Sequence, residues 1–290
     1  MSATPPRMSR SEPREVIELR HVKERQPELA PAVDLQMALI ELQRRVQARI
    51  PLPWIEFDAD WLKTQHAAGR PLLRFREIPI DWTDLRLIFR QTADVLLRFE
   101  ALEPQDYQSL QALGRDGHAL EPLVAAWFDR AADPGHTPPH PLTLPVKVSA
   151  DALEQVLELT LRPFLERCAE AVRQRADFST WRQPTCPLCG GAPELAALDA
   201  HGDRTLICGR CTTEWRFDRG VCPFCRNDDR QLLPSFRSRD GVYRLDACDV
   251  CRRYLKTFDS RQGRRHVLLA VDGIATLPLD AAAMQRGYRG

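Results

Sequence analysis

The sequence predicts a multidomain α+β protein, in which an all-helical N-terminal domain precedes a module of short β-hairpins. Two observations predict this. Apolar residues recur at helical spacing from about residue 34 to residue 173. Beyond them, eight of the nine cysteines fall between Cys186 and Cys251 as four C-x-x-C pairs, with hairpin-sized gaps inside the array. A chain of 290 residues with 43% hydrophobic residues is long enough for one large or two ordinary domains.

The first 30 residues are predicted to be a mobile N-terminal arm, because prolines stand there among many charges. A single short helix around Glu15–Arg25 is compatible with that arm. The first convincing helix begins at Asp34 and ends before Pro51. Asp58 and Asp81 are N-cap candidates for the next two helices, because a short acceptor side chain there satisfies free backbone N–H groups.

Two further helices follow, one led by Pro104 and one that contains Trp127. A proline-rich stretch over 133–145 predicts a stiff surface connection, since proline forbids a helix interior. The helix after Ser149 carries Cys168, which we expect to be a buried apolar residue. We place the helical domain at 31–180, the metal-binding module at 181–275 and a C-terminal tail at 276–290. In the metal-binding module, His266–Val271 is predicted to be a closing strand. In the C-terminal tail, Leu277–Gly290 is predicted to be a short helix with a loose end.

Each C-x-x-C pair is a knuckle, a tight turn that points two sulfurs the same way. Two thiolates at this spacing can hold one tetrahedral metal ion, and two knuckles complete a site of four sulfurs. Four knuckles therefore supply two complete sites. The predicted metal ligands are Cys186, Cys189, Cys208, Cys211, Cys222, Cys225, Cys248 and Cys251.

The gaps between the knuckles indicate how they pair. Eighteen residues separate the first knuckle from the second, twenty-two separate the third from the fourth, and ten separate the second from the third. Each longer gap is predicted to be a hairpin. The first hairpin pairs Glu194–Leu198 with Thr205–Ile207. The second pairs Leu232–Ser238 with Val242–Leu245 around an Asp-Gly turn. Hairpins pair the first knuckle with the second and the third with the fourth, as in an internal duplication. Spacing does not exclude cross-bracing, first with third and second with fourth.

Other uses of the cysteines stay open at this point. Disulfides are disfavoured, because the N-terminus shows no secretory signal and a reducing compartment is expected. A dithiol redox enzyme is disfavoured, because such sites carry one C-x-x-C at the start of a helix. Zinc ribbons and rubredoxins share the Pro-containing knuckle, so composition does not choose between zinc and iron.

Catalytic motifs are not found: the sequence has no Gly-rich phosphate loop, no G-x-S-x-G and no H-E-x-x-H. Sites of four thiolates leave no open position for a substrate, so we predict that the protein is not an enzyme. No apolar run approaches the roughly 18–20 residues of a membrane span.

A zinc-ribbon protein that binds nucleic acid is the alternative. Residues 1–180 carry a net charge of −4 and residues 181–266 carry +5. Two divalent ions with four thiolates each contribute about −2 apiece, which leaves the loaded module near neutrality and disfavours nucleic acid. The arginines that would serve it are Arg204, Arg210, Arg237, Arg239, Arg252, Arg253, Arg264 and Arg265.

The cysteine array resembles the FdhE family, accessory proteins for formate dehydrogenase. The likeness is carried by Cys186-Pro-Leu-Cys-Gly-Gly-Ala-Pro, Cys208-Gly-Arg-Cys-Thr-Thr-Glu-Trp, Cys222-Pro-Phe-Cys and Cys248-Asp-Val-Cys-Arg-Arg-Tyr-Leu-Lys. Upstream, Gly69-Arg-Pro-Leu-Leu and Arg162-Pro-Phe-Leu also look like that family. The resemblance covers roughly residues 35 to 275.

The resemblance implies a cytoplasmic maturation factor, needed to produce active formate dehydrogenase, that binds its catalytic subunit. It also implies that the eight paired cysteines bind iron in a rubredoxin-like manner and that a helical domain precedes them. Beside the second knuckle, Trp215, Arg216 and Arg219 are candidates for the partner surface, although Trp215 would equally suit packing inside the ribbon. A homo-oligomer is compatible with the sequence.

Overall fold

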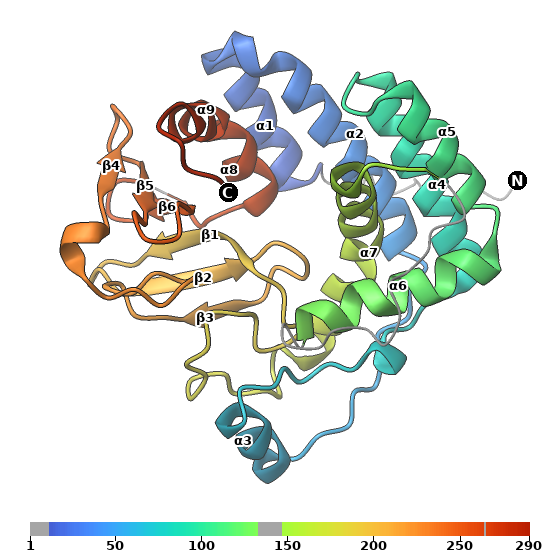
Figure 1. The fold of residues 1–290 in the computed structure, drawn as a ribbon, viewed down its shortest axis with the longest axis horizontal. Coiled ribbons are helices and arrows are strands. Elements are labelled where there is room, and N and C mark those ends of the chain that lie inside the picture. The colour runs from blue at the N-terminus through green and yellow to red at the C-terminus, as the bar shows by residue number, and fades with distance from the viewer. Residues whose placement is uncertain (1–11, 133–146, 264) are drawn as a thin grey trace, which may run out of the picture.

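The structure is a computed structural model that describes residues 12–132, 147–263 and 265–290. Residues 1–11 of the predicted arm, and the predicted connection at 133–145, lie outside the described residues. Within these residues, seven α-helices come first, then a sheet, then two short helices (Figure 1). The helices are α1 (Arg14–Arg25), α2 (Ala30–Gln47), α3 (Ala59–Ala67), α4 (Trp82–Arg98), α5 (Pro104–Leu113), α6 (Gly117–Ala132), α7 (Ala150–Val172), α8 (Leu269–Ala275) and α9 (Leu277–Gln285), with 3-10 turns at Pro27–Leu29, Phe75–Glu77 and Arg230–Leu232.

Both predicted aspartate caps begin helices. The Asp58 carboxylate accepts a hydrogen bond from the N–H of Trp61 at 2.7 Å at the start of α3. The Asp81 carboxylate accepts from the N–H groups of Thr83 and Asp84 at 2.9 Å at the start of α4. These bonds satisfy donors that have no partner inside the helix, which explains why the two helices begin there.

The helical region packs around α2, α4 and α7. Leu42 on α2, Phe89 on α4 and Leu165 on α7 are buried in one hydrophobic cluster. The same cluster continues into the sheet region, where it includes the cysteines of the first two knuckles and Trp215. One core therefore serves both regions, and the domain boundaries at residues 30, 180 and 275 stay predictions.

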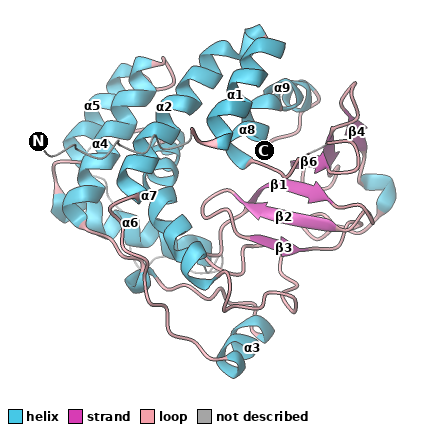
Figure 2. Cartoon of the chain, turned by 180° about the vertical axis from the view of Figure 1, so that it is seen from behind, coloured by secondary structure: helices cyan, strands magenta, loops and turns pink. Residues whose placement is uncertain are grey.

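Among the described residues the sheet has six strands in the order β3-β2-β1-β6-β5-β4, and Figure 2 shows its β3-β2-β1 half clearly. Both predicted hairpins are present, as the antiparallel pairs β1–β2 and β4–β5. A third strand, which the sequence analysis did not predict, is added to each hairpin: β3 beside β2 and β6 beside β5. The two halves join where β1 and β6 run parallel. The strands are β1 (Pro193–Leu198), β2 (Arg204–Cys208), β3 (Glu214–Arg216), β4 (Ser235–Arg237), β5 (Tyr243–Ala247) and β6 (Tyr254–Asp259).

The short helix expected around Glu15–Arg25 is confirmed, but from residue 12 onward the chain is packed and is not a mobile arm. Arg14–Arg25 forms α1, whose Leu19 and Val22 are buried against Val33 and Val271. Figure 1 shows α1 beside α8. Apolar burial of this kind offsets the conformational entropy that would keep a charged segment loose.

The closing strand predicted over His266–Val271 is wrong, because the chain turns into α8 there. The cause is Asp272, which is fully buried and accepts a hydrogen bond from the N–H of Leu268 at 2.7 Å while it pairs with Arg265. The short helix predicted next is confirmed as α9. The end of the tail is packed rather than loose, since the Tyr288 hydroxyl donates to Asp249 at 2.6 Å.

Hydrogen bonds join the helical region to the first two knuckles on two sides. The backbone N–H groups of Leu72 and Leu73 each donate at 2.8 Å to carbonyls of the first knuckle, those of Pro187 and Leu188. On the other side, the Arg162 guanidinium of α7 donates to the Gly209 carbonyl in the second knuckle at 2.7 Å. The metal module is therefore fastened to the helices at its first two knuckles.

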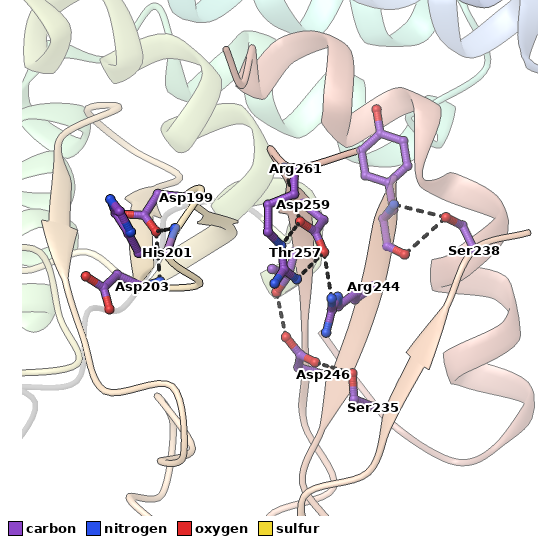
Figure 3. Close-up of polar contacts among 11 residues, drawn as sticks. Asp199, His201, Asp203, Ser235, Ser238, Arg244, Asp246, Thr257, Asp259 and Arg261 are labelled. Carbon is purple, nitrogen blue, oxygen red and sulfur yellow. Dashed lines mark hydrogen bonds and ion pairs between the residues drawn. The ribbon is translucent and has the colours of Figure 1, made fainter. Parts of the chain in front are cut away.

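A buried ion pair crosses the second half of the sheet. The Asp259 carboxylate is 1% exposed and accepts hydrogen bonds from Arg261 at 2.7 Å and from Arg244 at 2.6 Å (Figure 3). The hydrogen bonds from Arg261, with that from Arg244, hold the pKa of Asp259 well below its usual range. A lowered carboxyl pKa in the folded state means that ionisation of this group stabilises the fold.

We predict that Asp259→Asn lowers the free energy of unfolding by about 3–5 kcal/mol at pH 7, because Arg244 then lies buried without its counter-charge. The difference in the free energy of unfolding between the variant and the wild type should stay constant above pH ~5. It should shrink as the pH falls below ~4, the pKa of an aspartate in the unfolded state, because Asp259 stabilises the fold only while it is ionised. Urea unfolding of the two proteins across this range measures it. Asp228→Asn, in an exposed loop, is the matched control, and an equal loss in both variants would contradict the assignment.

Candidate metal centres

The first cluster is formed by the first and second knuckles, Cys186 with Cys189 and Cys208 with Cys211. The sulfur atoms lie 3.5 Å apart for Cys186–Cys211, 3.5 Å for Cys189–Cys208 and 3.4 Å for Cys189–Cys211. All four side chains have 0% exposure. Hairpin β1–β2 brings the two knuckles together, as the pairing by gap length predicted.

The second cluster is formed by the third and fourth knuckles, Cys222 with Cys225 and Cys248 with Cys251. Its sulfur atoms lie 3.7 Å apart for Cys222–Cys251 and 3.6 Å for Cys225–Cys248. Hairpin β4–β5 separates the knuckles in sequence and brings them together in space. The cross-braced pairing is therefore not the one that the structure adopts.

All four knuckles share one backbone geometry. In each, two backbone hydrogen bonds close the turn around the first cysteine. Its carbonyl accepts from the N–H of the residue four positions later at 2.9–3.1 Å. Its own N–H donates to the carbonyl of the residue five positions later at 2.8–3.0 Å. The residue after the second cysteine takes a left-handed conformation with φ of 57–76°. Only the first knuckle uses glycine there; the others hold an L-residue at a conformational cost. These four residues are Gly190, Thr212, Arg226 and Arg252.

The sulfur positions fit a metal ion. A tetrahedral ion with four sulfurs at about 2.3 Å places neighbouring sulfurs about 3.8 Å apart, whereas a disulfide places them at about 2.05 Å. The distances of 3.4–3.7 Å in both clusters lie near the first value. Backbone N–H groups of Leu188, Arg210 and Phe224 also donate to cluster sulfurs at 3.4–3.5 Å, which favours thiolates. The two clusters can therefore hold two metal ions.

The burial of the first cluster makes a cation necessary for thiolates to persist there. Burial raises the pKa of Cys186 and of Cys211 well above the usual thiol value. Four buried negative charges would be prohibitively costly without a counter-ion, and a bound metal supplies that charge.

Cys168 lies in neither cluster. It is fully buried, its pKa is raised to about 12 by burial, and it is confirmed as a buried apolar residue.

The two clusters differ in their access to solvent. The first lies inside the main hydrophobic core. In the second, Cys225 is exposed and Cys251 half-buried, and the fourth-knuckle residue Val250 is 57% exposed. The same local geometry is thus used once as an internal cross-link and once at the surface.

The three candidate partner residues lie in different environments. Trp215 is 2% exposed and its indole N–H donates to the Gln183 carbonyl at 3.1 Å, so it packs inside the module. Arg216 is exposed on the edge strand β3, where only a weak pair with Asp203 at 3.9 Å holds it. Arg219 is exposed in the loop that follows.

The arginines of the nucleic-acid alternative do not form one free surface. Arg204 is buried, Arg210 stacks on Trp127 and pairs with Glu154, and Arg265 pairs with buried Asp272. Arg252 pairs with Asp249 at 2.8 Å. Arg264 lies outside the described residues, and Arg237 and Arg239 are exposed.

Sequence reasoning missed the role of the segment Gly69-Arg-Pro-Leu-Leu. Gly69 has φ of +66° and turns the chain out of α3, so that Leu72 and Leu73 reach the first knuckle. The available signal was a Gly-x-Pro break followed by two leucines, which marks a turn without naming its partner.

In the part of the chain that the structure describes, none of the helices combines the length and apolar character needed to cross a membrane.

We predict two kinetic phases when a chelator removes metal from the loaded protein. The exposed second cluster should empty first, and the first cluster at least about tenfold more slowly, because a buried site opens only through local unfolding. Cys225→Ser should abolish the fast phase alone and Cys189→Ser the slow phase alone. Absorbance of a chromogenic chelator measures both rates. Cys168→Ala, the control, should keep both phases, and a single phase in the wild type would contradict the difference between the sites.

Comparison with known proteins gives a consistent result. No family model matches the chain. The chain is 31% identical over 110 residues to a Protein FdhE homolog of Shewanella oneidensis, which is 37% of this chain and 36% of that protein. It is 31% identical over 119 residues to Protein FdhE of Escherichia coli K12, which is 40% of this chain and 38% of that protein. The matched segments thus span less than two fifths of the curated relatives.

A solved structure extends the likeness in fold to nearly the whole chain. The crystal structure of the FdhE protein from Pseudomonas aeruginosa superposes with a TM-score of 0.63 at 21% identity, over 95% of this chain and 91% of that one. The likeness in fold thus includes both the helical region and the sheet. The sequence matches and the shared fold together support an FdhE family assignment for this chain.

Proposed function

We propose that this protein is a non-enzymatic maturation factor that acts in the cytoplasm to produce active formate dehydrogenase. The observation that carries the proposal is the likeness to FdhE proteins, in sequence over part of the chain and in fold over 95% of it. The role in formate dehydrogenase production comes from the family resemblance of the cysteine array. In this role the protein binds the catalytic subunit of formate dehydrogenase before that subunit is complete.

The eight paired cysteines are the proposed ligands of two metal ions. The family resemblance implies iron, and zinc binds equally well to four thiolates. Four sulfurs fill a tetrahedral shell, so neither site offers a position for a substrate or an activated water. A rubredoxin-like iron would supply one-electron transfer, whereas zinc would supply structure alone. The chain itself contributes the hydrogen-bonded knuckles that hold the sulfurs and the core that excludes water from the first cluster.

The proposed docking surface is the β3 edge of the sheet. β3 is the terminal strand of the order, and its residues alternate in burial, with Trp215 inside and Glu214 and Arg216 outside. Trp215 anchors the strand, which leaves Arg216 and Arg219 to face a partner. Exposed arginines beside a rigid metal-held knuckle suit an acidic surface, because little side-chain packing has to be disrupted on binding.

We predict that the double change Arg216→Glu with Arg219→Glu reduces capture of the formate dehydrogenase catalytic subunit by about tenfold or more, because reversed charges oppose the partner. A pull-down from cell extract with purified, metal-loaded bait measures it. Arg237→Glu, which is exposed on β4 at the opposite edge of the sheet, is the control and should bind as wild type does. Equal capture by all three baits would remove the surface, and no capture by any of them would remove the proposed partner.

A further inference from the structure

A cavity of about 440 Å³ lies between the two halves of the sheet, beside the second cluster. Its wall includes Leu198 from β1, Arg204 from β2, Arg244 from β5 and two ligand residues of the second cluster, Cys222 and Cys248. The cavity therefore lies at the join that the tandem arrangement creates, and nothing in the proposed maturation role requires it.

The lining of this cavity is strongly cationic. It contains five arginines and one carboxylate, that of Asp246. Asp246 forms no ion pair with them among the described residues. Its two oxygens accept hydrogen bonds from the hydroxyls of Ser235 at 2.6 Å and Thr257 at 2.7 Å (Figure 3). Of the five, only Arg244 forms an ion pair within the described residues, with Asp259. The five arginines are Arg204, Arg219, Arg230, Arg244 and Arg253.

Two of these guanidinium groups are buried and keep unused donors. Arg204 is 5% exposed and Arg244 is 6% exposed. Arg204 donates from Nη2 to the carbonyls of Asp218 and Val221, and Arg244 donates from Nη2 to Asp259. The Nε–H of each is buried without a hydrogen-bond partner in the described part of the chain. A buried donor left unpaired is unfavourable, so each guanidinium group keeps hydrogen-bonding capacity that no group of the described residues uses.

The second cluster accounts for part of this positive charge, not for all of it. Four thiolates around a divalent ion contribute about −2, and around a trivalent ion about −1. With Arg244 balanced by Asp259, the other four arginines and Asp246 give the lining a charge of +3, and the cluster leaves a surplus of about +1 to +2. The surplus matches an anion that carries one or two charges.

We propose that this cavity binds a small organic phosphate. A phosphate monoester carries about −1.5 to −2 charges near pH 7, and the planar guanidinium fork matches its oxygens. The apolar wall, with Leu198, Leu255 and the Phe224 ring on which Arg253 stacks at 3.7 Å, accommodates the organic part of the ligand. This assigns a ligand site beyond the proposed docking role; the two share Arg219, and the ligand site does not depend on the docking role.

The test is isothermal titration calorimetry of the full, metal-loaded chain with phenyl phosphate as the probe. We expect saturable 1:1 binding, which Arg230→Ala weakens by about fivefold or more and Arg204→Lys weakens at unchanged charge, because lysine lacks the fork. Arg230 is exposed, so its replacement should leave folding and metal content intact. Arg239→Ala, at the exposed β4–β5 turn, should bind as wild type does.

Three outcomes would overturn the proposal. The first is no saturable binding of phenyl phosphate up to about 10 mM, a concentration that already reports the weakest specific affinities. The second is benzoate binding as tightly as phenyl phosphate, which would mean that the cavity selects a single negative charge and not phosphate. The third is a single-stranded oligonucleotide that binds more tightly than the probe, with steep salt dependence, which would turn the arginines into a nucleic-acid surface.

Discussion

The constraint on which the structure depends is the first cluster, four thiols gathered within 4.8 Å of one another inside a hydrophobic core. Four thiolates cannot persist there without a cation, and with one the cluster becomes a cross-link between two turns of the chain. The chain segment after α3 and the C-terminal half of α7 attach to those same turns, through Leu72, Leu73 and Arg162. Occupation of this cluster is therefore coupled to the docking of the helical region on the sheet.

The duplicated module uses one local geometry for two purposes. Each half consists of a knuckle, a hairpin, a second knuckle and a third strand, and the parallel pair β1–β6 joins the halves. The helices cover the first cluster and leave the second exposed at Cys225. Burial, and not the knuckle itself, thus distinguishes the two clusters, one closed to solvent and one accessible. The join between the halves also creates the arginine-lined cavity, which neither half has alone.

Much of this architecture follows from local sequence rules. Asp58 and Asp81 predicted their helices because a cap is a local interaction, and the gap lengths predicted the hairpins because an intervening hairpin must bring its ends together. The strand β6 was missed, although its Tyr-Leu-Lys-Thr-Phe run has strand-forming residues, because its burial depends on both neighbours. α8 was mistaken for a strand because Asp272 acts through Arg265 and the Leu268 backbone. Such long-range polar contacts, like the convergence of arginines on the cavity, are set by tertiary structure and have no signature of fixed spacing.

The central claim is that sulfur atoms alone surround two ions. X-ray absorption at the metal edge of the native protein tests it most directly. The account predicts a shell of four sulfurs at about 2.3 Å and no nitrogen or oxygen ligand. Nitrogen or oxygen in that shell, or protein whose cysteines are joined to one another at about 2.05 Å with no bound metal, would contradict it.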